Sequence, residues 1–187
     1  MKRIFLITVV CFFSGLVQAA ELAGVYVEDK IQSSEGKALT LNGLGLREKL
    51  WVDVYVGSLY MPQKSQDVAE ILSRPGPWRV HLDFVYKKVS TNKLLEAWRE
   101  GFEKNQDAQS LAQLQERIEQ FYAIFNEDAL AKDQYVFEYI PGQGTQISKN
   151  GTLLGTIEGE DFKNALLEIW LGNHPADKNL KKGMLGL

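Results

Sequence analysis

Apolar and polar residues alternate along several stretches of the chain, and this period of two predicts strands. The clearest example is "WRVHLDFVYK" at 78–87, in which large apolar residues share one face. The segment Leu50–Met61 alternates in the same way. Further strands are predicted at 25–27, 39–41, 134–140 and on both sides of Asn150-Gly151, the dipeptide that most strongly indicates a hairpin.

Apolar residues spaced by three and four predict helices between these strands. A short helix follows Ser65 as its N-cap, and a longer one opens at Ser90-Thr91-Asn92. The next helix begins with the capping-box pair Ser110 and Gln113. A helix in "EDFKNALLEIWLG" and a short helical tail close the chain. The order of strands, helices, strands and helix predicts an α+β domain with a largely antiparallel sheet.

The first residues have the composition of a targeting segment. Lys2 and Arg3 precede an apolar run that ends near Val17-Gln18-Ala19, so residues 1–19 are predicted to be a secretory signal peptide. Residues 20–187 then form one domain. Cys11 is the only cysteine and lies in the signal, so the mature protein has no disulfide.

Charge narrows the possible partners. Without Lys2 and Arg3 the chain has 19 basic and 24 acidic side chains, a formal charge of −5, which is unfavourable for nucleic acid. No segment is long and apolar enough to span a membrane stably. No pattern identifies a protein partner.

Familiar catalytic and cofactor motifs are missing. "GLGLRE" lacks the third glycine of a dinucleotide fingerprint and precedes a strand rather than a helix. His81 and His174 have no metal-ligand spacing and are predicted to be surface residues. We therefore expect neither a cofactor nor a bound metal.

Arg47 remains as the candidate for binding a ligand or stabilising a reacting oxygen. A guanidinium carries a permanent charge and a fork of donors that suits a carboxylate, phenolate or enolate oxygen. Tyr55 lies eight residues later, an even spacing that puts both side chains on one face of an unbroken strand. The alternative is an arginine paired with a surface acid, and a bend at Glu48-Lys49 would reset the spacing.

Three segments, "GLGLREKLWVDVYVGSLYM", "YKKVSTNKLLEAWREGF" and "DFKNALLEIWLGNHPADKNLKKGMLG", resemble successive landmarks of the chalcone isomerase-like superfamily, and its bacterial secreted branch most of all. The resemblance implies an open-faced β-sandwich: a large, mostly antiparallel sheet covered by a helical layer, with an apolar cleft between them. In plant chalcone isomerases an arginine at the place of Arg47 steers the phenolate and enolate of a flavonoid during ring closure. Plant relatives without that activity bind fatty acids, holding the carboxylate with the same arginine and a tyrosine.

The family's functional residues carry over only in part. Arg47 matches the arginine, Asn92 the asparagine, and Tyr55 the tyrosine of the fatty-acid binders. Val54 and Ile169 stand where the enzymes have threonines, and Val85 where they have a tyrosine, with Tyr86 one residue away. The missing hydroxyl groups argue against chalcone isomerase chemistry, because losing one donor to a reactive oxygen can cost about a hundredfold in rate. Asn92 also stands at a helix start, where it could simply cap.

The sequence therefore favours a secreted, periplasmic, non-catalytic protein that binds a small amphipathic acid, such as a fatty acid, through Arg47, Tyr55 and Asn92. One alternative is an isomerase or intramolecular lyase acting on a conjugated carbonyl compound, with Arg47 stabilising an enolate and Tyr86 or Asn92 positioning water. Another is an envelope interaction protein that uses a sheet face or edge.

Overall fold

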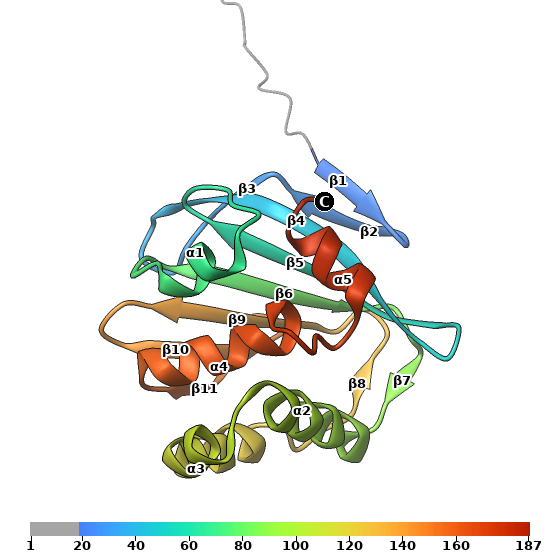
Figure 1. Ribbon diagram of the computed structural model, residues 1–187. Coiled ribbons are helices and arrows are strands. Elements are labelled where there is room, and N and C mark those ends of the chain that lie inside the picture. Colours follow the sequence, from blue (N-terminus) through green and yellow to red (C-terminus); the bar gives the residue numbers. More distant parts are fainter. Residues whose placement is uncertain (1–18) are drawn as a thin grey trace, which may run out of the picture.

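The computed structural model describes residues 19–187, so the predicted signal peptide, except Ala19, lies outside the described residues. Within this range a seven-stranded antiparallel sheet has the order β11-β10-β9-β6-β5-β4-β3, and two short ribbons, β1-β2 and β7-β8, lie beside it (Figure 1). The sheet strands are β3 (Lys30–Gln32), β4 (Ala38–Lys49), β5 (Val52–Met61), β6 (Trp78–Phe84), β9 (Gln134–Ile140), β10 (Gly144–Lys149) and β11 (Thr152–Ile157). The ribbon strands are β1 (Ala19–Leu22), β2 (Val25–Glu28), β7 (Lys88–Val89) and β8 (Ala129–Leu130).

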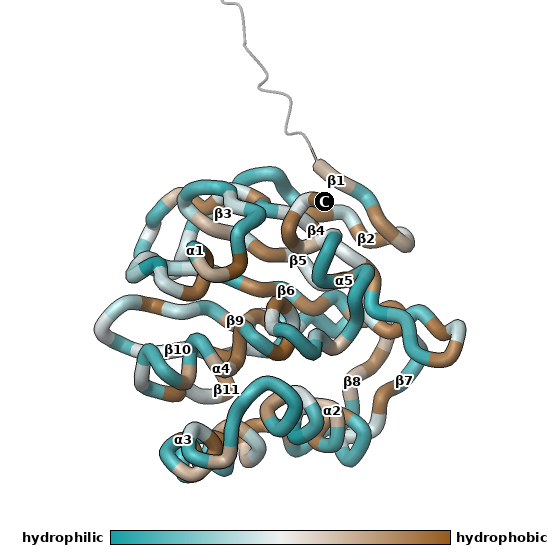
Figure 2. The backbone as a smooth tube through the Cα atoms, in the orientation of Figure 1, coloured by the Kyte–Doolittle hydropathy of each residue, from teal (hydrophilic) through white to brown (hydrophobic). Residues whose placement is uncertain are grey.

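Helices α2 (Thr91–Asn105), α3 (Ala108–Ala123) and α4 (Glu160–Leu171) cover one face of this sheet (Figure 1). The apolar side of each helix packs on the strands in one buried core, in which the rings of Trp98, Phe121, Phe137 and Trp170 contact one another. Figure 2 shows the matching pattern, with hydrophobic residues along the inner strands and hydrophilic ones on the outer turns of α2 and α3. The predicted α+β class and its sheet with a helical layer are confirmed.

Two of the predicted helix starts are wrong. Helix α1 (Val68–Ser73) is capped by Asp67 rather than Ser65, and α3 is capped by Asp107, so Ser110 lies inside the first turn. In each case an aspartate near the predicted cap accepts hydrogen bonds from first-turn N–H groups, which a carboxylate does well at the positive end of a helix. Helix α2 begins within the predicted start Ser90-Thr91-Asn92; Ser90 is its cap and accepts from the N–H of Lys93, so Asn92 is not the cap.

The prediction of one long strand from Leu50 to Met61 is also wrong at its beginning. Strand β4 runs on to Lys49, and the chain reverses at Leu50-Trp51 before β5 starts at Val52. Leu50 and Trp51 have φ angles of 51° and 66°, as a two-residue type I′ hairpin turn requires. Such turns usually use asparagine and glycine, so periodicity alone gave no sign of this one.

The glycines before Arg47 let a helix approach the sheet closely. Helix α5 (Lys178–Met184) crosses β4 near Gly43 and Gly45. A Cβ atom at Gly43 would lie 2.1 Å from the carbonyl oxygen of Gly183, and one at Gly45 would lie 2.6 Å from that of Leu180. "GLGLRE" is therefore a packing motif for the C-terminal helix and not a phosphate-binding loop.

The opposite face of the sheet is partly covered by the β1-β2 ribbon. His81 lies on this face and is mostly buried, so the prediction that it is a surface residue is wrong. His81 packs its ring 5.1 Å from that of Tyr60, and its Nε2 atom is buried without a hydrogen-bond partner. Burial, and secondarily the charge of Arg79, lowers the pKa of His81 from 6.5 to about 4. Tyr60, which contacts His81, packs in a second apolar cluster with Val25 and Val27 of the ribbon, a tertiary effect that strand periodicity does not reveal.

Stability is expected to fall as the pH drops from 6.5 towards 4. In this window the unfolded chain binds a proton at His81 that the folded chain does not, so the proton favours unfolding. A His81→Gln variant should lose this part of the dependence, worth about 2 kcal/mol between the two ends. The nearby Asp83, whose pKa is raised by burial, acts with the opposite sign, so the difference between parent and variant isolates the histidine. Urea denaturation at several pH values measures it, and parallel profiles would contradict it.

Candidate functional site

Arg47 and Tyr55 are cross-strand neighbours near the end of the β4-β5 hairpin. The register pairs them directly, so both side chains project from the sheet face that the helices cover. The guanidinium carbon of Arg47 lies 5.5 Å from the centroid of the Tyr55 ring. Their shared face, expected from even spacing in one strand, results instead from pairing across the hairpin.

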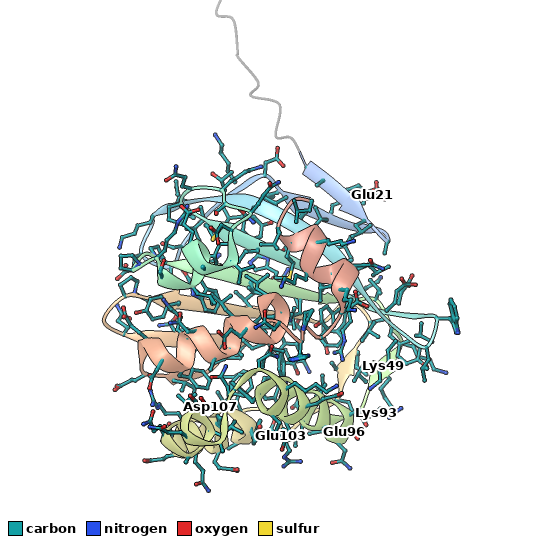
Figure 3. All side chains as sticks on the ribbon, viewed as in Figure 1. Glu21, Lys49, Lys93, Glu96, Glu103 and Asp107 are labelled. Atoms are coloured by element: carbon teal, nitrogen blue, oxygen red, sulfur yellow. The ribbon has the colours of Figure 1, made fainter. Side chains whose placement is uncertain are left out.

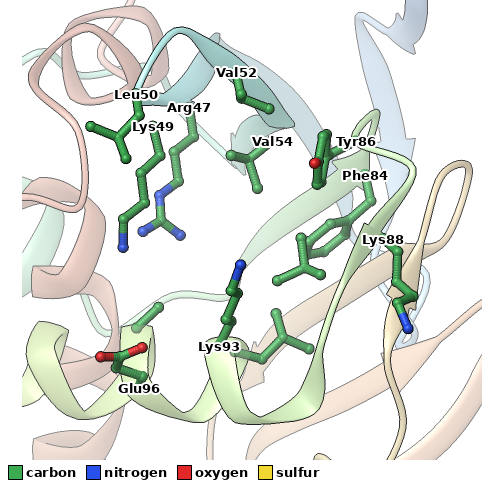
Figure 4. A pocket seen from close by; sticks show the side chains of 13 residues that line it. Arg47, Lys49, Leu50, Val52, Val54, Phe84, Tyr86, Lys88, Lys93 and Glu96 are labelled. Carbon is green, nitrogen blue, oxygen red and sulfur yellow. The ribbon is translucent and has the colours of Figure 1, made fainter.

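A cavity of about 270 Å³ opens beside Arg47 between the hairpin, the end of β6 and the first turns of α2. Its wall is mainly apolar. The lining residues are Arg47, Lys49, Leu50, Val52, Val54, Phe84, Tyr86, Lys88, Val89, Lys93, Leu94, Glu96 and Ala97. Figure 4 shows Arg47 and Lys49 projecting into this space from the hairpin and Lys93 from α2, with Glu96 also on α2. Its volume is near the lower end of the range of about 300–1,000 Å³ that is usual for small-molecule sites.

A second, smaller space of about 20 Å³ lies deeper and is separated from the first by Arg47, Phe84, Leu94 and Ala97, which line both. Tyr55 lines only this inner space. A volume of this size holds one water molecule or one ligand oxygen. The inner space therefore suits a polar group of a ligand whose apolar part occupies the outer cavity.

The Tyr55 hydroxyl has a defined orientation. It accepts a hydrogen bond of 3.2 Å from the indole Nε1 of Trp170, and both side chains are buried. Because the indole can only donate, the hydroxyl hydrogen stays available for an acceptor. Trp170 thus prepares Tyr55 as a donor.

Arg47 has its donors available as well. Among residues 19–187 it forms no salt bridge, and its Nε atom is buried without a hydrogen-bond partner. The side chain is only partly exposed. A buried, unpaired donor on a permanent cation is costly, and an anionic oxygen would satisfy it.

Of the other predicted site residues, Tyr86 lies at the cavity and Asn92 does not. Asn92 is exposed in the first turn of α2 and is not part of either lining. Tyr86 does line the outer cavity with Arg47, whereas Val85 does not. Val54 lines the outer cavity and Ile169 the inner one, so hydrocarbon stands where the resemblance would place hydroxyl groups.

Sequence reasoning missed four side chains of the candidate site. Lys49 and Lys93 were not considered, although Lys93 follows the helix start at Ser90 by three residues. Trp98 and Trp170 are core residues, yet Trp98 also lines the inner space and Trp170 donates a hydrogen bond to Tyr55. Only the packing of α2 and α4 on the hairpin reveals these roles. Within residues 19–187 no group of three metal-binding side chains comes together.

The described part of the chain is therefore an antiparallel sheet covered by helices, with an apolar cavity beside an arginine that forms no salt bridge. The sequence matches the family described as chalcone isomerase-like over residues 19–186. The chain therefore belongs to the chalcone isomerase-like family, as the resemblance predicted.

A solved structure supports the same fold. The crystal structure of a fatty-acid binding protein of Arabidopsis thaliana aligns with a TM-score of 0.68 and 18% identity, covering 90% of this chain and 96% of that one. A comparison with curated protein sequences gave no match.

Proposed function

We propose that this protein binds a fatty acid or a similar small amphipathic acid, with the carboxylate held by Arg47 and Tyr55 and the apolar tail in the outer cavity. The observation that carries the proposal is the partly buried guanidinium without an acidic partner, standing between an apolar cavity and a small inner space. A carboxylate at this place would satisfy both the buried Nε donor and the free Tyr55 hydroxyl hydrogen. The fatty-acid binding neighbour is consistent with this ligand class.

The charge and the wall of the outer cavity both favour a ligand with an anionic head and an apolar tail. Arg47, Lys49, Lys88 and Lys93 line the outer cavity against the single acidic Glu96, so the local charge favours an anion although the whole chain is acidic. Between these charges the wall consists of aliphatic and aromatic carbon, which gains about 25 cal/mol for each Å² of ligand surface it covers. The site thus selects a ligand with one anionic end.

Native mass spectrometry and isothermal titration calorimetry test the proposal. Protein purified from its own host should carry a lipid acid, and delipidated protein should bind saturated fatty acids of increasing chain length until the cavity is filled. A protein that binds none of these acids would overturn the proposal.

Replacing Tyr55 by phenylalanine is expected to weaken fatty-acid binding by about tenfold, because one hydrogen bond to a charged carboxylate is lost, at a cost of about 1.5 kcal/mol or more. Calorimetry measures the change. Tyr122→Phe, on α3 and outside both linings, is the matched control and should bind as the parent does. An unchanged affinity in Tyr55→Phe would show that the carboxylate does not enter the inner space.

One observation favours a second function, that of an isomerase or intramolecular lyase on a conjugated carbonyl compound. Tyr86 lines the same cavity as Arg47 and could position water beside an enolate. The proposal of a binder is preferred because Val54 and Ile169 supply no hydroxyl groups and Asn92 lies outside the cavity. Turnover of chalcones, followed by absorbance and abolished in Arg47→Ala, would reverse this preference.

We also propose that the protein is secreted, into the periplasm if the host is a bacterium, on the strength of the N-terminal pattern of residues 1–19. N-terminal sequencing of the mature protein should give a start just after Ala19 or Ala20. Within residues 19–187 no helix has the length and apolar character needed to cross a membrane.

A further inference from the structure

The turn of the β4-β5 hairpin carries two large apolar residues in open solvent. Leu50 is 84% exposed and Trp51 is 97% exposed, although the other tryptophans, Trp78, Trp98 and Trp170, are buried. Both turn residues adopt a positive φ, which costs a side-chain-bearing residue free energy that asparagine or glycine would largely avoid. The sequence thus keeps two residues that harm both solubility and turn formation. We refer to Leu50 and Trp51 as the tip.

Basic side chains lie next to the tip. Lys49 precedes it directly, and Lys49, Lys88 and Lys93 line the outer cavity together with Leu50. Lys88 pairs with Asp128, whereas Lys49 and Lys93 form no salt bridge within residues 19–187. Figure 3 shows Lys49 and Lys93 on the same side of the molecule, where the hairpin projects beyond the sheet.

The acidic groups near the tip are Glu48, Asp53, Glu96 and Glu100. Glu48 and Asp53 are cross-strand partners in the hairpin, and Glu96 lies across the cavity from Lys49. The pKa of Glu100 is lowered by its hydrogen bond to Lys104 and also by the charges of Lys49 and Arg47. The charged residues of the cavity lining itself are four cations and one anion, so the charge of the lining is opposite to the net charge of the chain. An apolar tip with a tryptophan, flanked by lysines, has the chemistry of a contact with an anionic lipid surface.

We propose that the tip inserts into the interface of an anionic phospholipid bilayer, with Lys49 and Lys93 against the headgroups. Trp51 then occupies the headgroup level, where an indole is stable with its ring in apolar surroundings and its N–H hydrated. Because Leu50 belongs to both the tip and the cavity lining, docking brings the cavity mouth to the lipid surface. A lipid acid could then enter without crossing water. Only this transfer step rests on the proposed function; docking itself does not.

The single exposed tryptophan makes the test specific. Vesicles of phosphatidylglycerol are expected to shift the Trp51 emission to shorter wavelength, and brominated lipids should quench it, while the three buried tryptophans contribute a constant background. Phosphatidylcholine vesicles should give much weaker binding, and added salt should weaken the binding to phosphatidylglycerol. Unchanged emission with both lipids would overturn the proposal.

The double variant Leu50→Asn/Trp51→Gly removes the apolar tip and supplies the residues that a type I′ turn prefers, so folding is not at risk. Sedimentation with phosphatidylglycerol vesicles should be at least about tenfold weaker than for the parent. Leu153→Asn, which removes an exposed leucine from β11, is the matched control and should sediment like the parent. Equal sedimentation of the double variant and the parent would refute the proposal.

Two further results separate the possibilities. Tyr55→Phe changes no charge at a buried position, so it should dock on vesicles like the parent although its fatty-acid binding is weakened, and failure of docking and failure of ligand binding are distinguishable. A concentration-dependent dimer that is lost in the double variant, without vesicle binding by the parent, would assign the tip to a second copy of the chain and overturn the lipid assignment.

Discussion

Replacing Arg47 by alanine is expected to weaken fatty-acid binding by about a hundredfold or more, measured by calorimetry on delipidated protein. The guanidinium supplies charge-assisted hydrogen bonds to the carboxylate, each worth about 1.5–3 kcal/mol in a partly dry site. Folding should not suffer, because the change removes a buried donor that has no partner in the free protein. The loss should be largest at low salt and should shrink as salt screens the mouth of the cavity.

Two further variants test whether the affinity depends on the planar pair of donors of Arg47 or only on its positive charge. Arg47→Lys keeps the charge but not the planar pair of donors, so it should restore only part of the affinity. Arg99→Ala removes a cation from the outer side of α2, outside both linings, and should leave the affinity unchanged. Equal affinities for the parent and Arg47→Ala would contradict the proposed carboxylate site.

Replacing Gly43 by alanine is expected to destabilise the fold by about 3 kcal/mol. The new Cβ atom would meet three backbone atoms of the C-terminal segment, at 2.1 Å from Gly183 O, 2.7 Å from Gly186 N and 2.9 Å from Met184 O. Backbone cannot move aside as a flexible side chain can, so helix α5 must lift from β4, at a cost near the upper end of that for overpacking. Chemical denaturation measures the loss, and faster hydrogen exchange in α5 should accompany it.

The control for this change is Gly76→Ala. Gly76 lies in the loop before β6, where an added Cβ would meet nothing closer than 4.0 Å. Its effect should stay within about 1 kcal/mol and could be stabilising, because alanine reduces the entropy of the unfolded chain. Similar losses at Gly43 and Gly76 would show that the close approach of α5 is not important for stability.

The two clearest sequence predictions depend on short-range physics. The alternation in β6 and β9 predicts strands because side chains must alternate between a covered and an open face. Asn150-Gly151 predicts the hairpin turn because both residues tolerate the positive φ angles that it requires. The start of α2 at Ser90 follows from the need of first-turn N–H groups for an acceptor. By contrast, the Leu50-Trp51 turn carries no local turn signal, and the pairing of β4 with β5 overrides what its residues prefer.

Two of the three predicted ligand-binding residues, Arg47 and Tyr55, lie together in the structure, and the third, Asn92, does not. Arg47 and Tyr55 could be named because an isolated guanidinium and a strand tyrosine match the pattern of a known family, and the hairpin pairs them. Asn92 could not be judged, since whether a first-turn side chain faces the cavity depends on how α2 is rotated against the sheet. Lys93, one residue later, lines the cavity instead.

The sequence by itself determined the class of the fold, most of its elements and the one arginine suited to an anion, because these depend on periodicity, capping and side-chain chemistry within short segments. Only the tertiary structure decided that "GLGL" makes room for α5, that Trp170 orients Tyr55, and that the unpaired Arg47 stands between two spaces. The reason is physical. Cavities and close backbone contacts arise where segments distant in sequence meet, and no single segment contains the information on how they pack.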